Sequence, residues 1–440
     1  MVRLFTKNVL TILAGTLMVS SVASAKVYVN SVCHMKTSAS TKEIKGDGDI
    51  TKKFPLASIS KIVTSLWAVE KLGVDYRYKT ILHLTPTANG RMDIHIEGSR
   101  DPMFGRNMSY FLISELNRMK ITNIEKLTFD ENFLMHWLAE ESPLIGGVTP
   151  RYETIEQQAA VVRKHLLEYF ATAINKSMYS SLRTKATKNN VFMLEKPSIT
   201  VRSVEFVPKS QYKKEQLTAS VVLKSAPLRM LLKRMNNQSN NYIADNLYWN
   251  LGGTSAFNSF AQSTLNATSS QIVFHNGSGN NEGTTAKPIY NEASCETMIK
   301  AIYALNKALT AKGYKLSDVM AVANKDSDST VDNFGGVASG AMVAKTGTVN
   351  KAKTLAGSIS TKDGEFFFAI LLHADMDQNS SDRGVATQMI KNKVAQMINN
   401  RSGPRAINYT EFIPLAFDTG SYLTEYQTIT PAPSVSLNKQ

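Results

Sequence analysis

At residues 55–64 the chain reads Pro55-Leu56-Ala57-Ser58-Ile59-Ser60-Lys61-Ile62-Val63-Thr64, which places Ser58 three residues before Lys61 at the start of an apolar run. The apolar residues recur at intervals of three and four through Leu66 and Val69, and this period predicts a helix with one buried face. Residues three apart on a helix are neighbours, so the Lys61 amine is expected beside the Ser58 hydroxyl. Because a serine hydroxyl becomes nucleophilic only when a base removes its proton, the two residues are a candidate nucleophile and base.

Ser-x-x-Lys is a weak motif by itself, because about two copies are expected by chance in a chain of this length. Another copy, Ser210-Gln211-Tyr212-Lys213, lies in the charged run from Lys209 to Glu215, which has no apolar period and is predicted to be a solvated loop. The helical setting distinguishes Ser58 and Lys61 from that copy. Further motifs must decide whether the pair is catalytic.

Residues 1–25 are predicted to be a secretory signal peptide. Arg3 and Lys7 precede an apolar run, and Ala23-Ser24-Ala25 provides the small residues of a cleavage site, so the mature chain is expected to begin at Lys26. An uncleaved membrane anchor fits less well, since the apolar run is short for a span. The mature protein is therefore expected outside the cytoplasm, in the periplasm.

The composition is basic, with 50 Lys and Arg against 36 Asp and Glu and a net charge of +14 over 440 residues. Such a charge favours anionic partners. Basic residues do not alternate with aromatic residues as in nucleic-acid-binding segments, and an exported protein rarely meets nucleic acid. We therefore expect an acidic cell-wall polymer and no nucleic acid, with peripheral contact to a membrane or wall surface as a further expectation.

The two cysteines, Cys33 and Cys295, would lie in an oxidising compartment where a disulfide persists. Their pairing depends on geometry, and the sequence leaves it open. The seven histidines are scattered, and no His or Cys spacing indicates zinc. No metal or other cofactor is predicted.

Two further short motifs follow Ser58 and Lys61 along the chain. Ser239-Asn240-Asn241 lies in a polar loop between helices predicted over residues 227–235 and 242–251. Lys345-Thr346-Gly347-Thr348 lies on a strand predicted over residues 342–349. Each is weak alone, but each lies in local structure suited to a catalytic site: a helix start, an interhelical loop and a strand.

A sheet is predicted from three consecutive strands near the C-terminus, over residues 342–349, 353–360 and 365–373. The third strand is apolar on both faces, so helices must cover its sheet on both sides. The candidates are the Ser58 helix and a helix over residues 385–397.

The three motifs together resemble those of the penicillin-recognising serine enzymes. More narrowly, the chain is similar to the class C low-molecular-mass penicillin-binding proteins, the D-alanyl-D-alanine carboxypeptidases and endopeptidases of the DacB-like S13 peptidase family. Residues 98–104, the loop Asn276-Gly277-Ser278-Gly279 and residues 345–357 also follow that family's pattern. Asn240 and Asn276 stand where the family often has Asp.

The resemblance implies an α/β (α+β) fold, in which a penicillin-binding-protein or β-lactamase-like transpeptidase domain has an antiparallel sheet flanked by helices. It also implies a smaller inserted α+β domain between the first two motifs. The expected division is residues 26–75 and 217–440 for the discontinuous catalytic domain and residues 76–216 for the insertion. Residues 105–215 are expected to hold two helices, near 108–119 and 155–174.

The resemblance also implies the role of each group in acyl transfer. Ser58 would attack a D-alanyl peptide carbonyl, with Lys61 as the base, its pKa lowered by burial and by the neighbouring Lys345. Ser239 would relay a proton to the leaving amine, and Asn241 would form hydrogen bonds with the substrate amide and with the lysine. The substrate carboxylate would be bound by Lys345, Thr346, Gly347 and Thr348. The N–H groups of Ser58 and Thr348 would form the oxyanion hole.

The implied function is a peptidoglycan D,D-peptidase that is acylated by β-lactams at Ser58. Its partners would be peptidoglycan stems and cross-links, and carboxypeptidase and endopeptidase action both stay open. A β-lactamase is a weaker alternative, because no residue can be assigned as a dedicated deacylation base. A catalytically silent wall-binding scaffold is disfavoured because all three motifs are intact, and the absence of Gly-x-Ser-x-Gly disfavours an α/β-hydrolase.

Overall fold

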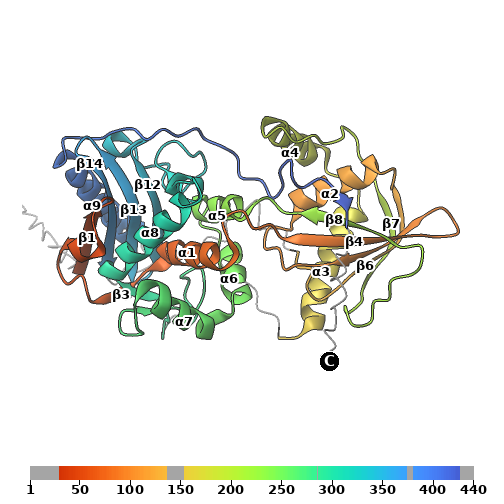
Figure 1. The fold of residues 1–440 in the computed structure, drawn as a ribbon, viewed down its shortest axis with the longest axis horizontal. Coiled ribbons are helices and arrows are strands. Elements are labelled where there is room, and N and C mark those ends of the chain that lie inside the picture. Colours follow the sequence, from red (N-terminus) through yellow and green to blue (C-terminus); the bar gives the residue numbers. More distant parts are fainter. Residues whose placement is uncertain (1–28, 136–152, 285, 374–379, 427–440) are drawn as a thin grey trace, which may run out of the picture.

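The computed structural model describes residues 29–135, 153–284, 286–373 and 380–426, arranged as two lobes side by side (Figure 1). The predicted signal peptide and the last residues of the chain lie outside the described residues. One lobe contains the Ser58 segment and all three motifs, and the other is built mainly from the residues between the first two motifs. Among the described residues, no helix is both long and apolar enough to cross a membrane.

The first lobe is built on a six-stranded antiparallel sheet in the order β11-β12-β13-β14-β1-β2. The three C-terminal strands lie close to where the apolar pattern predicts them. The strands of this sheet are β1 (Val29–Lys36), β2 (Lys45–Asp47), β11 (Ala321–Val322), β12 (Met342–Val349), β13 (Ala352–Thr361) and β14 (Gly364–His373). A smaller sheet beside it contains β3 (Lys53–Pro55), β10 (Glu292–Ser294) and β9 (Ile272–Val273).

Helices cover both faces of the large sheet, as the apolar strand β14 requires. Alternate residues of β14 belong to two different hydrophobic clusters: Phe367 packs in the cluster that contains α8, and Phe368 packs in the cluster that contains α9. The prediction was wrong about one cover, because α8 rather than the Ser58 helix α1 lies against β1 and β14, and α1 packs on α8. The helices of this lobe are α1 (Ser60–Leu72), α5 (Leu228–Asn237), α6 (Asn241–Asn250), α7 (Gly253–Leu265), α8 (Cys295–Thr310) and α9 (Ser380–Asn399).

The second lobe has a mixed six-stranded sheet in the order β15-β8-β4-β5-β6-β7, in which β6 runs parallel to β5 and β7. Three of the described helices accompany this sheet, whereas two were expected. The helix α3 ends at Phe170, and a further helix begins after Asn175. The Asn175 side chain caps that helix by accepting a hydrogen bond from the Met178 N–H. The elements are β4 (Lys79–Pro86), β5 (Met92–Glu97), β6 (Asn123–Phe129), β7 (Thr200–Phe206), β8 (Ala219–Lys224), β15 (Thr424–Glu425), α2 (Arg106–Arg118), α3 (Ile155–Phe170) and α4 (Lys176–Lys188).

The strand pairing places two segments in the second lobe that were assigned to the catalytic domain. Strand β8 pairs with β4, and β15, near the end of the described chain, pairs with β8. A range ending at residue 216 would separate β8 from the sheet that completes its hydrogen bonds. We therefore propose that the second lobe comprises the described residues between about 76 and 225 together with the segment from about 414 to 426.

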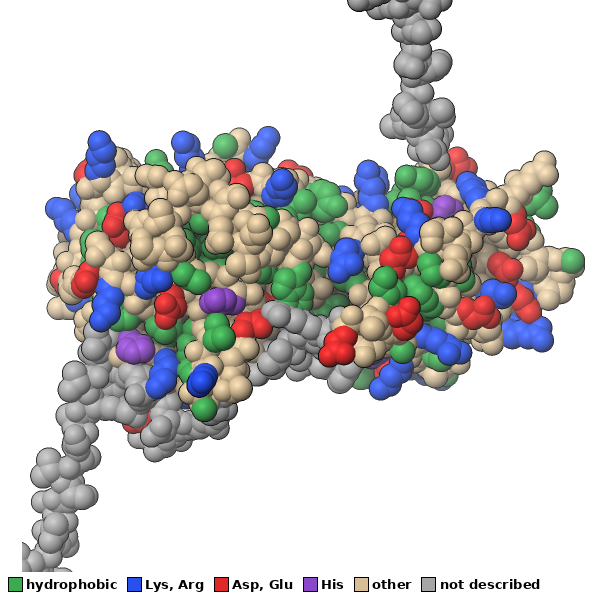
Figure 2. Space-filling view, turned by 90° about the horizontal axis from the view of Figure 1, so that it is seen from below, with side chains coloured by type: hydrophobic (Ala, Val, Ile, Leu, Met, Phe, Trp, Pro, Cys, Tyr) green, Lys and Arg blue, Asp and Glu red, His purple; other side chains and the backbone are tan. Residues whose placement is uncertain are grey.

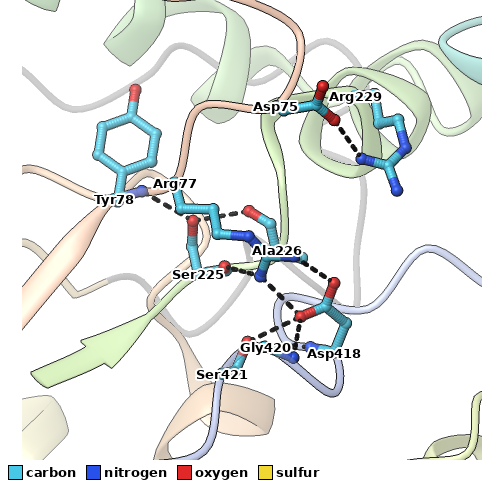
Figure 3. A network of polar contacts seen from close by, with 9 residues as sticks. All are labelled: Asp75, Arg77, Tyr78, Ser225, Ala226, Arg229, Asp418, Gly420 and Ser421. Carbon is cyan, nitrogen blue, oxygen red and sulfur yellow. Dashed lines mark hydrogen bonds and ion pairs between the residues drawn. The ribbon is translucent and has the colours of Figure 1, made fainter. Parts of the chain in front are cut away.

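The junction between the lobes is held by Arg77, which precedes β4 (Figure 3). Its guanidinium binds both carboxylate oxygens of Asp418 at 2.7 Å and donates to the Ser225 carbonyl oxygen at 2.9 Å. The Ala226 N–H donates to the Ala416 carbonyl oxygen at 2.7 Å. The chain crosses between the lobes at Arg77 and again at Ser225 and Ala226. The C-terminal segment that contains Ala416 and Asp418 binds to both crossings.

The surface carries both signs of charge. On the face shown in Figure 2, Lys and Arg side chains are spread over both lobes among Asp and Glu side chains rather than gathered in one stripe. On this face the basic side chains therefore form no single stripe for an anionic polymer.

Cys33 and Cys295 form a disulfide, which settles the question that the sequence leaves open. The bridge joins β1 to the first residue of α8, and the Cα atoms are 6.1 Å apart. It therefore fastens the helix that covers the large sheet to one of that sheet's strands.

Replacing both cysteines by alanine is expected to lower the free energy of unfolding by about 2–5 kcal/mol, because the bridge restricts the unfolded chain. It connects residues 262 positions apart, so its loss frees a long loop. Chemical denaturation followed by tryptophan fluorescence measures the change. Reductant should destabilise the native protein and leave the double variant unaffected, and equal stability of the two oxidised proteins would contradict the prediction.

Candidate active site

Ser58 lies in a short 3₁₀ turn, Ala57–Ile59, and not in the helix itself, which begins at Ser60. The prediction was therefore wrong about the element but right about the contact: the Lys61 Nζ atom lies 3.0 Å from the Ser58 Oγ atom. Ala57 has a φ of 50°, a left-handed conformation that an alanine adopts only when its surroundings require it. This turn leaves Ser58 partly exposed at the end of a buried helix.

The Lys61 amine is fully buried and has three neighbours within hydrogen-bond distance. Besides Ser58 Oγ, it lies 2.8 Å from Asn241 Oδ1 and 2.9 Å from the Ser278 carbonyl oxygen. The last two atoms can only accept hydrogen bonds. A neutral amine has two N–H donors and one lone pair, so these acceptors would take both donors and leave the lone pair for the Ser58 hydroxyl.

Burial lowers the pKa of Lys61 to about 7, and the Asp245 carboxylate opposes this shift. Lys345, which was expected to contribute, is not among the causes. Lys345 is itself fully buried, and its own pKa is lowered well below the usual value by burial and then by Lys61 and Lys353. Near neutral pH, Lys61 is therefore able to exist as a free amine.

The loop between α5 and α6 positions the second motif. Ser239 has a φ of 55° and is buried. The Asn240 side chain accepts a hydrogen bond from the Ile243 N–H at 3.0 Å and so caps α6. An asparagine caps a helix as well as an aspartate does, so the departure from the family pattern costs nothing here. The cap makes Asn241 the first residue of α6, with its side chain at Lys61.

Strand β12 packs against the Ser58 turn through Gly347. A Cβ atom on Gly347 would lie 2.2 Å from Thr354 Oγ1 and 2.8 Å from the Leu56 carbonyl oxygen, too close for any side chain. The Thr354 hydroxyl donates to that same carbonyl oxygen at 2.8 Å. The absence of a side chain at this position therefore brings the third motif onto the nucleophile turn.

A cavity of about 120 Å³ opens where these segments meet. It is lined by Ser58, Ser239, Asn241, Gly279, Asn280, Thr330, Thr346, Gly347, Thr348 and Val349. The structure thus brings together six of the eight predicted site residues, and the other two, Lys61 and Lys345, are buried close to them. Strand β11 pairs with β12 only at Val343 and Ala344, so none of the described strands pairs with the rest of that edge. An extended peptide can align there.

Sequence reasoning missed two groups that support Lys61. The Ser278 carbonyl oxygen accepts from Lys61, and the Ser278 N–H donates to Asp245 Oδ1 at 2.8 Å. The glycine-rich loop was a usable signal for Ser278, because a Cβ on Gly279 would lie 1.9 Å from the Ala57 carbonyl oxygen. Asp245 lies within a helix and carried no sequence signal.

The family model of the D-Ala-D-Ala carboxypeptidase 3 (S13) family matches residues 194–394. The solved structure of the predatory endopeptidase Bd0816 from Bdellovibrio bacteriovorus, in complex with the immunity protein Bd3460, is 76% identical to this chain. It covers 90% of this chain and 100% of its own, with a TM-score of 0.88. The chain belongs to the S13 family of serine peptidases.

Other S13 structures are also similar. The penicillin G-acylated form of the predatory endopeptidase Bd3459 from the same organism is 60% identical, covers 91% of this chain and 100% of its own, and has a TM-score of 0.84. Penicillin-binding protein 4 (DacB) of Haemophilus influenzae, at 17% identity, covers 84% of this chain and 96% of its own with a TM-score of 0.57, and so shares the fold. The expected fold class is confirmed. No curated protein sequence matches the chain.

The rate of Ser58 acylation is expected to rise with pH and to level off above about 7, because Lys61 must be neutral to accept the hydroxyl proton and its pKa is about 7. Stopped-flow acylation by a chromogenic β-lactam between pH 5 and 9 measures this profile. An Asp245→Asn variant should shift the inflection to lower pH, since the carboxylate raises the pKa. A rate independent of pH across this range would contradict the role of Lys61.

Gly347→Ala is expected to reduce acylation at least about 100-fold, because the new methyl group must push β12 away from the Ser58 turn and a displacement of about 1 Å is sufficient for such a loss. Gly335→Ala is the matched control, since nothing lies within 4 Å of its Cβ position. Comparable acylation rates in the two folded variants would show that this packing does not set the site geometry.

Proposed function

We propose that the protein is a serine D,D-peptidase of peptidoglycan that acts as a D-alanyl-D-alanine carboxypeptidase, a D,D-endopeptidase or both. The observation that carries the proposal is the arrangement around the Lys61 amine. Asn241 Oδ1 and the Ser278 carbonyl oxygen can only accept hydrogen bonds, so they take the two N–H groups of the neutral amine and leave its lone pair for the Ser58 hydroxyl. This arrangement supplies the activated nucleophile that acyl transfer needs. The similarity to peptidoglycan endopeptidases supports the choice of substrate.

In the proposed acylation, Ser58 Oγ forms a bond to the carbonyl carbon of the D-alanyl residue and its proton passes to Lys61 Nζ. The N–H groups of Ser58 and Thr348 stabilise the oxyanion. The carbon–nitrogen bond then breaks, and the proton passes from Lys61 through the Ser239 hydroxyl to the leaving amine. Water hydrolyses the resulting ester with Lys61 again as the base.

The same proposal assigns the carboxylate that follows the scissile bond to strand β12. Thr346 and Thr348 offer hydroxyl groups on the cavity wall, and Lys345 provides a buried amine that donates to the Thr346 carbonyl oxygen at 2.7 Å. A β-lactam presents a carbonyl and a carboxylate in a similar relation, so it would acylate Ser58 as penicillin G acylates Bd3459.

The proposed site of action is the periplasm, reached through the predicted signal peptide. A cell-wall substrate requires action outside the cytoplasm, and the disulfide fits an oxidising compartment. We also propose a protein partner, an inhibitor of the immunity-protein kind, because Bd0816 was solved in complex with such a protein.

Fluorescent penicillin should attach covalently to the purified protein and to a Ser210→Ala variant, but not to Ser58→Ala. Ser210 is the matched control because it also precedes a lysine by three residues, in an exposed segment. Incubation with purified muropeptides should release D-alanine or separate cross-linked dimers. Equal labelling of both variants would contradict the proposal. Rapid turnover of a chromogenic β-lactam would indicate a β-lactamase instead. Binding to the cell wall without released products would indicate a scaffold.

A further inference from the structure

Two cationic side chains, Lys353 and Arg383, lie beyond the proposed carboxylate site, at the mouth of the cavity. Lys353 is the cross-strand partner of Thr348 on β13, and its Nζ atom donates to Thr348 Oγ1 at 2.7 Å. Thr348 is exposed and lines the cavity, whereas Lys353 is only partly exposed. The amine is therefore held at the rim of the active site by a neutral hydroxyl group.

Arg383 approaches the same place from the first turn of α9. One of its terminal nitrogens, Nη2, donates to Asn350 Oδ1 at 3.2 Å, in the turn between β12 and β13. Its Nε atom is buried and has no hydrogen-bond partner in the described part of the chain. The guanidinium thus has an N–H donor that none of the described residues uses.

Among the described residues, no carboxylate compensates this pair. The pKa of Lys353 is lowered by burial and then by Arg383, and no acidic group is among the causes. Neither side chain forms an ion pair with any described residue. Two other sheltered cations are matched: Lys233 pairs with Asp326 at 2.7 Å, and Arg77 pairs with Asp418 at the lobe junction.

The charge at the rim also acts on the amine behind the cavity wall. Lys353 lowers the pKa of the buried Lys345, and no acidic group is among the causes of that shift. Holding such charges close together in a partly desolvated place is unfavourable unless an anion joins them. The arrangement is that of a site prepared for a negatively charged ligand.

We propose that Lys353 and Arg383 bind a second carboxylate of the substrate, on the leaving-group side of the scissile bond, and that they favour cross-linked peptides over free stem peptides. The inference rests on the proposed function. In the proposed function, the carboxylate that follows the scissile bond binds to Thr346 and Thr348. Parts of the substrate that extend past Thr348 therefore belong to the leaving group. A single D-alanine has only that first carboxylate, whereas the leaving group from a cross-link is a whole stem peptide with further carboxylates.

The test compares two substrates, a purified cross-linked muropeptide dimer and a monomeric pentapeptide muropeptide. The quantity measured is kcat/KM for the dimer divided by kcat/KM for the pentapeptide. In Lys353→Met and in Arg383→Gln, this ratio should fall about 10- to 100-fold, as expected for a lost charge-assisted contact. Most of the fall should come from a higher KM for the dimer. Added salt should reduce the same ratio in the native protein.

Two further variants control for charge and folding. Lys353→Arg keeps the charge and should retain most of the preference. Lys362→Met removes a lysine from the turn at the opposite end of β13 and should leave the ratio unchanged. Fluorescent penicillin labelling of each variant shows that Ser58 is still reactive and the fold intact.

Equal losses on both substrates in Lys353→Met and Arg383→Gln would mean that these residues serve the first carboxylate, which would overturn the second subsite. An unchanged ratio in labelled, folded variants would overturn it as well. If the native protein is labelled by penicillin but cleaves neither muropeptide, the proposed function itself fails, and the inference falls with it.

Discussion

The active site depends on the burial of one amine. Lys61 can be sheltered from water only if the Ser58 turn, the first residue of α6 and the loop that contains Ser278 all reach it together. These segments lie far apart in the sequence and belong to different elements, so forming the core of the first lobe also assembles the base. Burial has a chemical effect too, because it brings the pKa of the amine into the physiological range.

Much of this site could be predicted from the sequence because motifs report local chemistry. The Ser58 and Lys61 spacing holds in a 3₁₀ turn as it would in a helix, so an error in the element left the contact unchanged. The strands β12 to β14 were predictable because the turns between them are short and the apolar residues are continuous. The Ser278 carbonyl oxygen acts through the backbone, so its own side chain gives no signal, and the trace that it leaves in the sequence is the glycine-rich loop around it.

The remaining differences arise from long-range packing. Which helix covers a sheet depends on how the elements are arranged in three dimensions, so α8 could replace α1 as the cover without any change in the apolar period of either helix. The pairing of Cys33 with Cys295 and the capture of β8 and β15 by the second sheet likewise depend on partners distant in the sequence. A single sequence contains the pattern of each segment but not the identity of its neighbour.

The contact between Arg77 and Asp418 also bears on the order in which the protein matures. Asp418 lies close to the C-terminus, whereas the two chain crossings that it helps to hold are made much earlier in the sequence. A chain that emerges from its N-terminus onward can therefore form both lobes before it can fasten them to each other. The relative position of the lobes becomes fixed only when the segment that contains Asp418 has returned from one lobe to the other.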